Sequence, residues 1–127
     1  MQLDTMRPAE TADVDPAVIE TFRTVAADLV IHVWGGDWCG DCQDQLPQFA
    51  AVLEAAGIDP AETNHYPVEK DEDGSKIGPQ VDAYAIAYIP TIVIEYAGHE
   101  IARFVESAPE PAAAVLADQL RDELDIE

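Results

Sequence analysis

Two cysteines three positions apart are the residues of this chain best suited to chemistry. Cys39 and Cys42 are its only cysteines, and they lie in the segment Trp38-Cys39-Gly40-Asp41-Cys42. Residues at this spacing on a helix lie one above the other, close enough for their sulfurs to bond. A C-x-x-C pair between a strand and a helix is therefore typical of a dithiol that cycles with its disulfide.

The two sulfurs are expected to be unequal. Cys42 shares an apolar helical stripe with Leu46 and Phe49, whereas Cys39 lies at the mouth of the helix beside Gly40. Unpaired amide donors and the positive end of the helix dipole favour a thiolate at that mouth. We therefore predict that Cys39 is the nucleophile that attacks a disulfide and that Cys42 is the resolving thiol that completes the exchange.

Apolar periodicity predicts the elements that position this pair. Leu29–Trp34 is a short apolar run rich in β-branched residues, which indicates a strand buried on both faces. His32 within it is expected to be a satisfied core or edge histidine. Cys39–Ala56 has a helical period and contains Pro47, which should kink the helix. Before this strand, Asp15 and Pro16 are expected to open a helix. After the second helix, we expect an edge strand over Asn64–Glu69, a charged loop over Lys70–Lys76, and a short helix marked by Ile77, Val81 and Tyr84. The chain is then expected to form a hairpin of Thr91–Tyr96 and Ile101–Val105, turning at Ala97 and Gly98, and a final helix capped by Ser107 and Glu110.

Acidic residues dominate the composition and limit the classes of partner. The chain carries 26 Asp and Glu against 6 Lys and Arg, a formal net charge of −20. Such a surface repels phosphate backbones and anionic lipid, so neither nucleic acid nor a membrane is an expected partner. No apolar run approaches the roughly 18 residues of a membrane span, and residues 1–14 lack the apolar core of an export signal. We expect a cytoplasmic monomer with a halophilic surface adapted to concentrated salt, the alternative being a dedicated basic partner.

With these motifs the chain resembles the thioredoxin family. The matching features are the Trp-Cys-x-x-Cys segment, Pro47, Ile89-Pro90-Thr91 ahead of the hairpin, and Gly98 in its turn. The likeness implies an α/β, thioredoxin-like three-layer sandwich with a central mixed β-sheet and helices on both faces. The family's first strand has no match in the polar lead-in, so it is expected to be missing, and one domain is expected over residues 15–127.

The resemblance also implies a function and the residues that perform it. It implies a thiol-disulfide oxidoreductase that reduces protein or small-molecule disulfides, with electrons from a thioredoxin reductase or a comparable dithiol donor. It further implies that the Ile89–Pro90 bond is cis and lies against the cysteine pair, where the backbone of Ile89 pairs with an extended substrate and Trp38 lines the surface. No cofactor is expected beyond the Cys39–Cys42 disulfide, because the chain has no Gly-rich loop to bind a flavin or nicotinamide.

The active-site segment departs from the family at two places. Gly40-Asp41 stands where thioredoxin has Gly-Pro, and an anionic Asp41 should disfavour the Cys39 thiolate. Val33 occupies the place of the family's buried acid, while strand alternation turns the adjacent His32 to the opposite face. Slower resolution by Cys42 is the expected consequence.

Two other interpretations use the same cysteines. A zinc site needs four ligands, and the remaining imidazoles, His32, His65 and His99, have unrelated spacing, so no metal is expected. A redox-sensing binding module, whose dithiol switches a partner interaction without turnover, is the alternative function. Sequence cannot separate this module from an enzyme, whereas multiple turnovers can.

Overall fold

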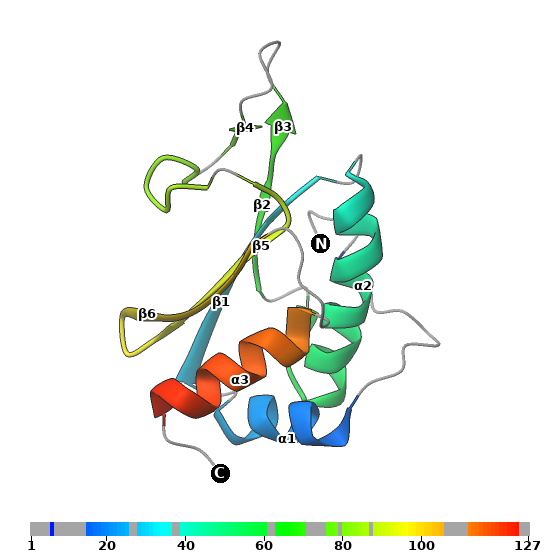
Figure 1. Cartoon of the computed structure of the whole chain (residues 1–127), viewed down its shortest axis with the longest axis vertical. Helices are drawn as coiled ribbons and strands as arrows, with labels where there is room; N and C mark the ends of the chain where they lie inside the picture. The colour runs from blue at the N-terminus through cyan, green and yellow to red at the C-terminus, as the bar shows by residue number, and fades with distance from the viewer. Residues whose placement is uncertain are drawn as a thin grey trace.

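The described chain forms a four-stranded sheet with helices packed against it (Figure 1). The computed structural model describes residue 6 and residues 15–25, 28–36, 39–60, 63–70, 76–78, 80–86, 88–105 and 112–124. Its elements in chain order are α1 (Pro16–Val25), β1 (Leu29–Gly35), α2 (Gly40–Ala55), β2 (Asn64–Pro67), β3 (Glu69–Lys70), β4 (Lys76–Ile77), β5 (Thr91–Tyr96), β6 (His99–Val105) and α3 (Ala112–Leu124).

The sheet is mixed, with strand order β2-β1-β5-β6. β1 and β2 are parallel neighbours joined through α2, whereas β5 is antiparallel to both β1 and β6. This is the mixed α/β sheet that the sequence analysis expects. β2 forms one edge of the sheet, which accommodates Pro67 because proline cannot donate to a ladder. β3 and β4 form a separate two-stranded ribbon on either side of the loop expected to be charged.

α1, α2 and α3 lie together on one face of the sheet (Figure 1). The rings of Phe22 in α1 and Phe49 in α2 meet edge to face at 6.1 Å. Arg121 of α3 donates hydrogen bonds to Thr21 Oγ1 and the Ala17 carbonyl in α1, at 2.9 Å each. The side chains of β1, β5 and β6 that alternate toward this layer are buried, namely Ile31, Val33, Ile92, Ile94, Ala102 and Phe104.

The other face of the sheet, called the back face here, has no helix among the described residues. The short helix predicted around Ile77, Val81 and Tyr84 is wrong, because residues 80–85 form turns. Gln80 and Ala85 have φ angles of 60° and 54°, in the left-handed region that interrupts a right-handed helix. The sequence analysis expects helices on both faces of the sheet, but on the back face an irregular segment takes the place of the expected helix.

Local signals explain how the helices begin and which faces they bury. Asp15 Oδ1 accepts the Ala17 amide at 2.9 Å, so Asp15 caps α1 as predicted. α2 runs through Pro47 and buries the whole predicted stripe, which consists of Cys42, Leu46, Phe49, Ala50 and Leu53. Ser107 and Glu110, predicted to cap the last helix, lie outside the described residues. Within the lead-in, Met6 is completely buried in the core, and the domain boundary at residue 15 stays a prediction.

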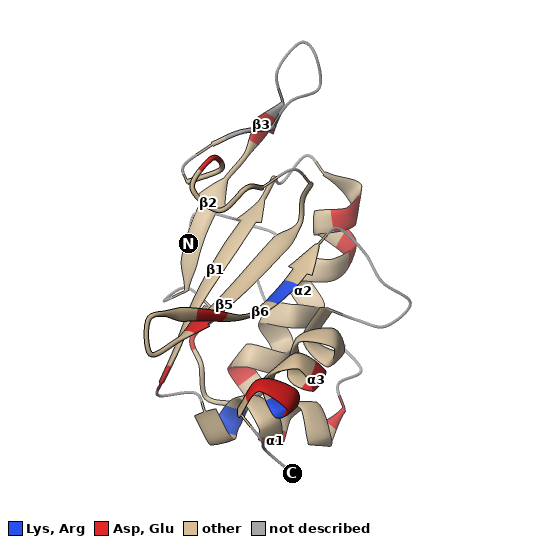
Figure 2. Ribbon diagram, turned by 60° about the vertical axis from the view of Figure 1, so that its left-hand side comes forward, with Lys and Arg blue, Asp and Glu red and all other residues tan. Residues whose placement is uncertain are grey.

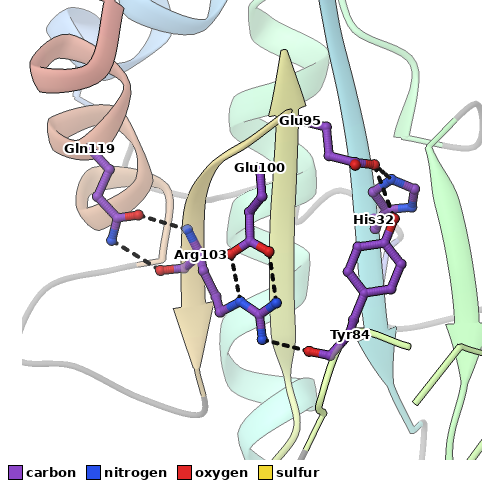
Figure 3. Close-up of polar contacts among 6 residues, drawn as sticks. All are labelled: His32, Tyr84, Glu95, Glu100, Arg103 and Gln119. Atoms are coloured by element: carbon purple, nitrogen blue, oxygen red, sulfur yellow. Dashed lines mark hydrogen bonds and ion pairs between the residues drawn. The ribbon is translucent and has the colours of Figure 1, made fainter. Parts of the chain in front are cut away.

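The hairpin forms as predicted, and its free edge is covered. Ala97 and Gly98 both have positive φ, 52° and 83°, as the tight turn between twisted strands requires. β6 begins at His99, two residues earlier than the predicted Ile101. The side chain of Gln119 in α3 accepts the backbone amide of Arg103 at 2.7 Å and donates to its carbonyl at 3.0 Å (Figure 3). These bonds occupy backbone groups that an added strand would use.

Acidic residues are distributed over much of the described chain (Figure 2). The described arginines each pair with an acid three residues away: Arg23 with Glu20, Arg103 with Glu100 and Arg121 with Asp118. Red segments lie along all three helices and the hairpin, with few blue ones between them. In the described ranges, no helix has the length and apolarity needed to cross a bilayer.

Candidate active site

Cys39 lies at the junction where β1 gives way to α2. It is the residue immediately before the helix and has extended backbone angles, φ −88° and ψ 125°. Its amide donates to the Gly36 carbonyl at 3.0 Å, and its carbonyl accepts the first helical bond from the Gln43 amide at 3.0 Å. The Cys39 side chain makes no capping hydrogen bond to the start of α2. Its partly exposed sulfur therefore stands at the positive end of the helix dipole.

Cys42 lies one turn further along α2, inside the core. Its side chain has no exposed surface, and the Gly36 amide points at its sulfur over 3.5 Å. The pKa of the Cys42 thiol is raised from 9.0 to about 12, mainly by burial, against the opposing effect of the Gly36 N–H. Cys39 and the negative charge of Asp41 make smaller contributions to this rise. Cys42 consequently holds its proton over the whole neutral range.

The predicted difference between the two sulfurs is confirmed as a difference in exposure. Both residues are free thiols, Cys39 partly exposed and Cys42 completely buried. A partner disulfide can therefore approach Cys39 more readily than Cys42. The assignment of Cys39 as nucleophile and Cys42 as resolving thiol stays a prediction of this asymmetry.

The loop before β5 lies beside the exposed sulfur. The Ile89–Pro90 bond is cis, as the resemblance implied, and Cys39 Sγ is 4.0 Å from the Ile89 carbonyl oxygen. Both residues of that bond are buried, whereas the side chain of Tyr88 is 55% exposed. Thr91 Oγ1 donates to the Tyr88 carbonyl at 2.5 Å and so fixes the backbone on both sides of the bond.

Three further residues from the sequence prediction have different outcomes. Gly40 is the first residue of α2, and apart from its chain neighbours and the helix backbone, a Cβ atom added to it would meet no other atom within 4 Å. Asp41 is exposed in the first turn of the helix. Trp38 lies outside the described residues, so its predicted place on the surface around Cys39 stays a prediction. Tyr88 was not predicted, although a large aromatic residue directly before Ile89-Pro90 is a sequence signal that could have found it.

The strand beneath the cysteines supplies no acid to the buried thiol. Val33 has no exposed surface and packs in the core, where its side chain can neither accept nor donate a proton. His32 faces the other way, as predicted, and its ring nitrogens contact Tyr66 and Glu95. It is thus the satisfied histidine that the sequence suggested. Among the described residues, no three His, Cys, Asp or Glu side chains converge as metal ligands would.

Comparisons with known proteins find similar structures but no close relative. No family model matches the chain, and no curated protein matches it. A point mutant of the thioredoxin from Halobacterium salinarum NRC-1 is 19% identical with a TM-score of 0.45, covering 97% of this chain and 95% of its own. A thioredoxin from Trypanosoma brucei brucei is 17% identical with a TM-score of 0.46, at coverages of 98% and 97%. A DsbH oxidoreductase is 16% identical with a TM-score of 0.48, at coverages of 100% and 92%. At these similarities, function has to be argued from the site itself.

Proposed function

We propose that this chain is a thiol-disulfide oxidoreductase that reduces protein or small-molecule disulfides through Cys39 and Cys42. The observation that carries the proposal is the placement of the two sulfurs. One is accessible at the open start of α2, and the other is enclosed one turn later. A vicinal pair with this asymmetry can form a mixed disulfide at the first sulfur and break it with the second.

The reaction transfers two electrons from the dithiol to the substrate. The Cys39 thiolate attacks one sulfur of the substrate disulfide, that bond breaks, and the other substrate sulfur leaves as a thiolate. Cys42 then loses its proton and attacks Cys39 Sγ, which releases the second substrate sulfur. The products are a Cys39–Cys42 disulfide and a reduced substrate, and an external dithiol donor such as a thioredoxin reductase restores the pair.

The loop beside Cys39 supplies a way to hold a substrate. The Ile89 carbonyl oxygen lies 4.0 Å from Cys39 Sγ, so a substrate amide bonded to that oxygen would bring its own cysteine to the exposed sulfur. We assign Ile89 and Pro90 to substrate binding on this basis, and Trp38 by its position next to Cys39 in the sequence. The negative charge of Asp41 would modulate the reactivity of the pair.

Trapping of covalent intermediates tests the assignment of the two roles. Cys42→Ser should accumulate a mixed disulfide between Cys39 and a protein substrate, detected as a mass increase that dithiothreitol reverses. Cys39→Ser is the matched control, because it keeps one cysteine but leaves it buried, and it should trap little. Equal trapping by the two variants would contradict the assignment.

A turnover measurement separates the enzyme from a redox-sensing module. With a regenerating dithiol in excess, an enzyme reduces many equivalents of a disulfide substrate per chain. A sensor is oxidised once and then stops. Oxidation of the Cys39–Cys42 pair without catalytic turnover would therefore contradict the proposed activity while leaving the dithiol chemistry intact.

A further inference from the structure

A cluster of aromatic and polar side chains covers the back face of the sheet. It consists of His32 and Trp34 from β1, Tyr66 from β2, Glu95 from β5, and Tyr84 from the irregular segment before β5. The rings of Trp34 and Tyr66 stack with centroids 4.6 Å apart, and the ring of Tyr84 contacts Trp34 in a tilted arrangement with centroids 4.9 Å apart. We call these five residues the back-face cluster. It lies on the opposite side of the sheet from α2, and the proposed reaction uses none of its groups.

Glu95 joins the segment containing Tyr84 to β1. The Tyr84 hydroxyl donates to Glu95 Oε1 at 3.2 Å, and the same oxygen contacts His32 Nε2 (Figure 3). On the other side of the imidazole, His32 Nδ1 is 2.9 Å from the Tyr66 hydroxyl. Arg103 reaches the same segment from β6, because its Nη1 donates to the Tyr84 carbonyl at 2.9 Å. Tyr84 is thus held by its hydroxyl, its ring and its backbone.

The segment around Tyr84 needs such anchoring because its own backbone is unfavourable. Gln80 and Ala85 have positive φ without being glycine, a conformation in which the Cβ atom crowds the following carbonyl oxygen. Such residues persist where surrounding contacts determine the conformation. Val81 and Ile86 supply buried apolar contacts, and Tyr84 supplies the polar ones.

Two residues of the back-face cluster lie shortly before the backbone segments that contact Cys39 and Cys42. From Tyr84 the chain runs on to Ile89, whose carbonyl lies 4.0 Å from Cys39 Sγ. From Trp34 it runs on to Gly36, whose amide points at Cys42 Sγ over 3.5 Å. The ring contact between Trp34 and Tyr84 therefore connects the two backbone segments that flank the dithiol.

We propose that the back-face cluster is a positioning device, which fixes the Ile89 carbonyl relative to Cys39 and thereby sets the affinity for extended peptide substrates. This inference rests on the proposed function, since it assumes that a substrate backbone pairs at Ile89. Tyr84 and Glu95 act through Ile89 and do not touch the reacting sulfurs. Their loss should therefore weaken the binding of an extended peptide, whereas a disulfide without a peptide backbone gains nothing from Ile89.

Two mixed disulfides with the same leaving group test this selectivity. One joins thionitrobenzoate to the cysteine of a short extended peptide, and the other joins it to 2-mercaptoethanol. The reduced full-length protein is mixed with increasing concentrations of each, and release of thionitrobenzoate is followed in a single turnover. The variants are Tyr84→Phe, which removes the hydroxyl that bonds Glu95, and Glu95→Gln, which removes the charge. Tyr96→Phe, which removes a hydroxyl from the neighbouring residue of β5, is the matched control.

Both cluster variants should raise the half-saturating peptide concentration by about tenfold, the factor that about 1.4 kcal/mol produces. The maximal rate, the rate with the 2-mercaptoethanol disulfide and the behaviour of Tyr96→Phe should change little. An equal slowing with both disulfides would overturn the proposal, because it would show a general loss of structure. Unchanged peptide binding would overturn it as well. Failure of the proposed function is distinguishable, because the unmodified protein would then react with neither disulfide faster than a free thiol does.

Discussion

The rate at which Cys42 breaks a mixed disulfide should depend steeply on pH. Attack requires the Cys42 thiolate, and the pKa of this thiol is raised from 9.0 to about 12, mainly by burial. A rise of this size lowers the thiolate fraction at neutral pH by up to about a thousandfold. The resolution step should therefore be slow at neutral pH and should accelerate as the solution becomes alkaline.

The mixed disulfide itself relieves part of this shift. Once Cys39 is bonded to a substrate, its hydrogen bond and its charge no longer raise the pKa of Cys42. Burial, which is the largest cause of the shift, persists, and so does the charge of Asp41. We therefore expect the resolution rate to rise about tenfold per pH unit between about pH 7 and pH 9, without levelling off in that range.

Stopped-flow absorbance with dithiobis(nitrobenzoate) measures the two steps separately. The first equivalent of thionitrobenzoate reports attack by Cys39, and the second reports resolution by Cys42. The Cys39→Ser variant is the control, because its single buried cysteine should react slowly and in one phase. A second phase that already bends toward a plateau at pH 9 or below would refute the reasoning, since Cys42 would then ionise at or below its ordinary pKa of 9.0.

Three further outcomes follow from the same structure. The pKa of Cys42 in the folded protein, about 12, exceeds its ordinary value of 9.0, so the free energy of unfolding of the reduced protein should fall as pH rises from about 9 toward 12. Denaturant titrations on both sides of pH 9 measure this fall, and in Cys42→Ala the contribution of the thiol to it should be absent. Phe104→Ala empties a site that is 2% exposed and should cost about 3–5 kcal/mol in urea unfolding, whereas Val105→Ala, 41% exposed on the same strand, should cost less than about 1 kcal/mol. Asp41→Asn should speed the first phase of the same stopped-flow reaction, and the gain should shrink in molar salt; a gain independent of salt would show that charge is not its cause.

The elements that position the cysteines could be predicted because their signals are local. An apolar run of β-branched residues ends at Trp34, and a helical stripe begins at Cys42, so strand, junction and helix follow from periodicity. The same stripe predicts which sulfur is buried, and the structure agrees. The proximity of Ile89 to Cys39 came from the family resemblance and not from any local pattern, since fifty positions separate the two residues.

The segment before β5 could not be predicted, because tertiary contacts determine its conformation. Its apolar spacing suggests a helix, yet Gln80 and Ala85 take left-handed backbone angles that nothing in their residue types demands. Tyr84, the residue that anchors this segment, finds its partners on β1, β5 and β6. Contacts between positions so far apart leave no trace in the periodicity of a single sequence.

The alternation of β1 turns Val33 and His32 toward opposite faces of the sheet. Val33 faces the core beneath α2, while His32, one residue earlier, faces Glu95 on the back of the sheet. The imidazole and the carboxylate are therefore separated from Cys42 by the sheet itself. Gly36, whose amide contacts the Cys42 sulfur, can stabilise a thiolate but cannot accept its proton. Neither His32 nor Glu95 is therefore placed to take the proton that leaves Cys42, and we expect the resolution step to follow the external pH closely.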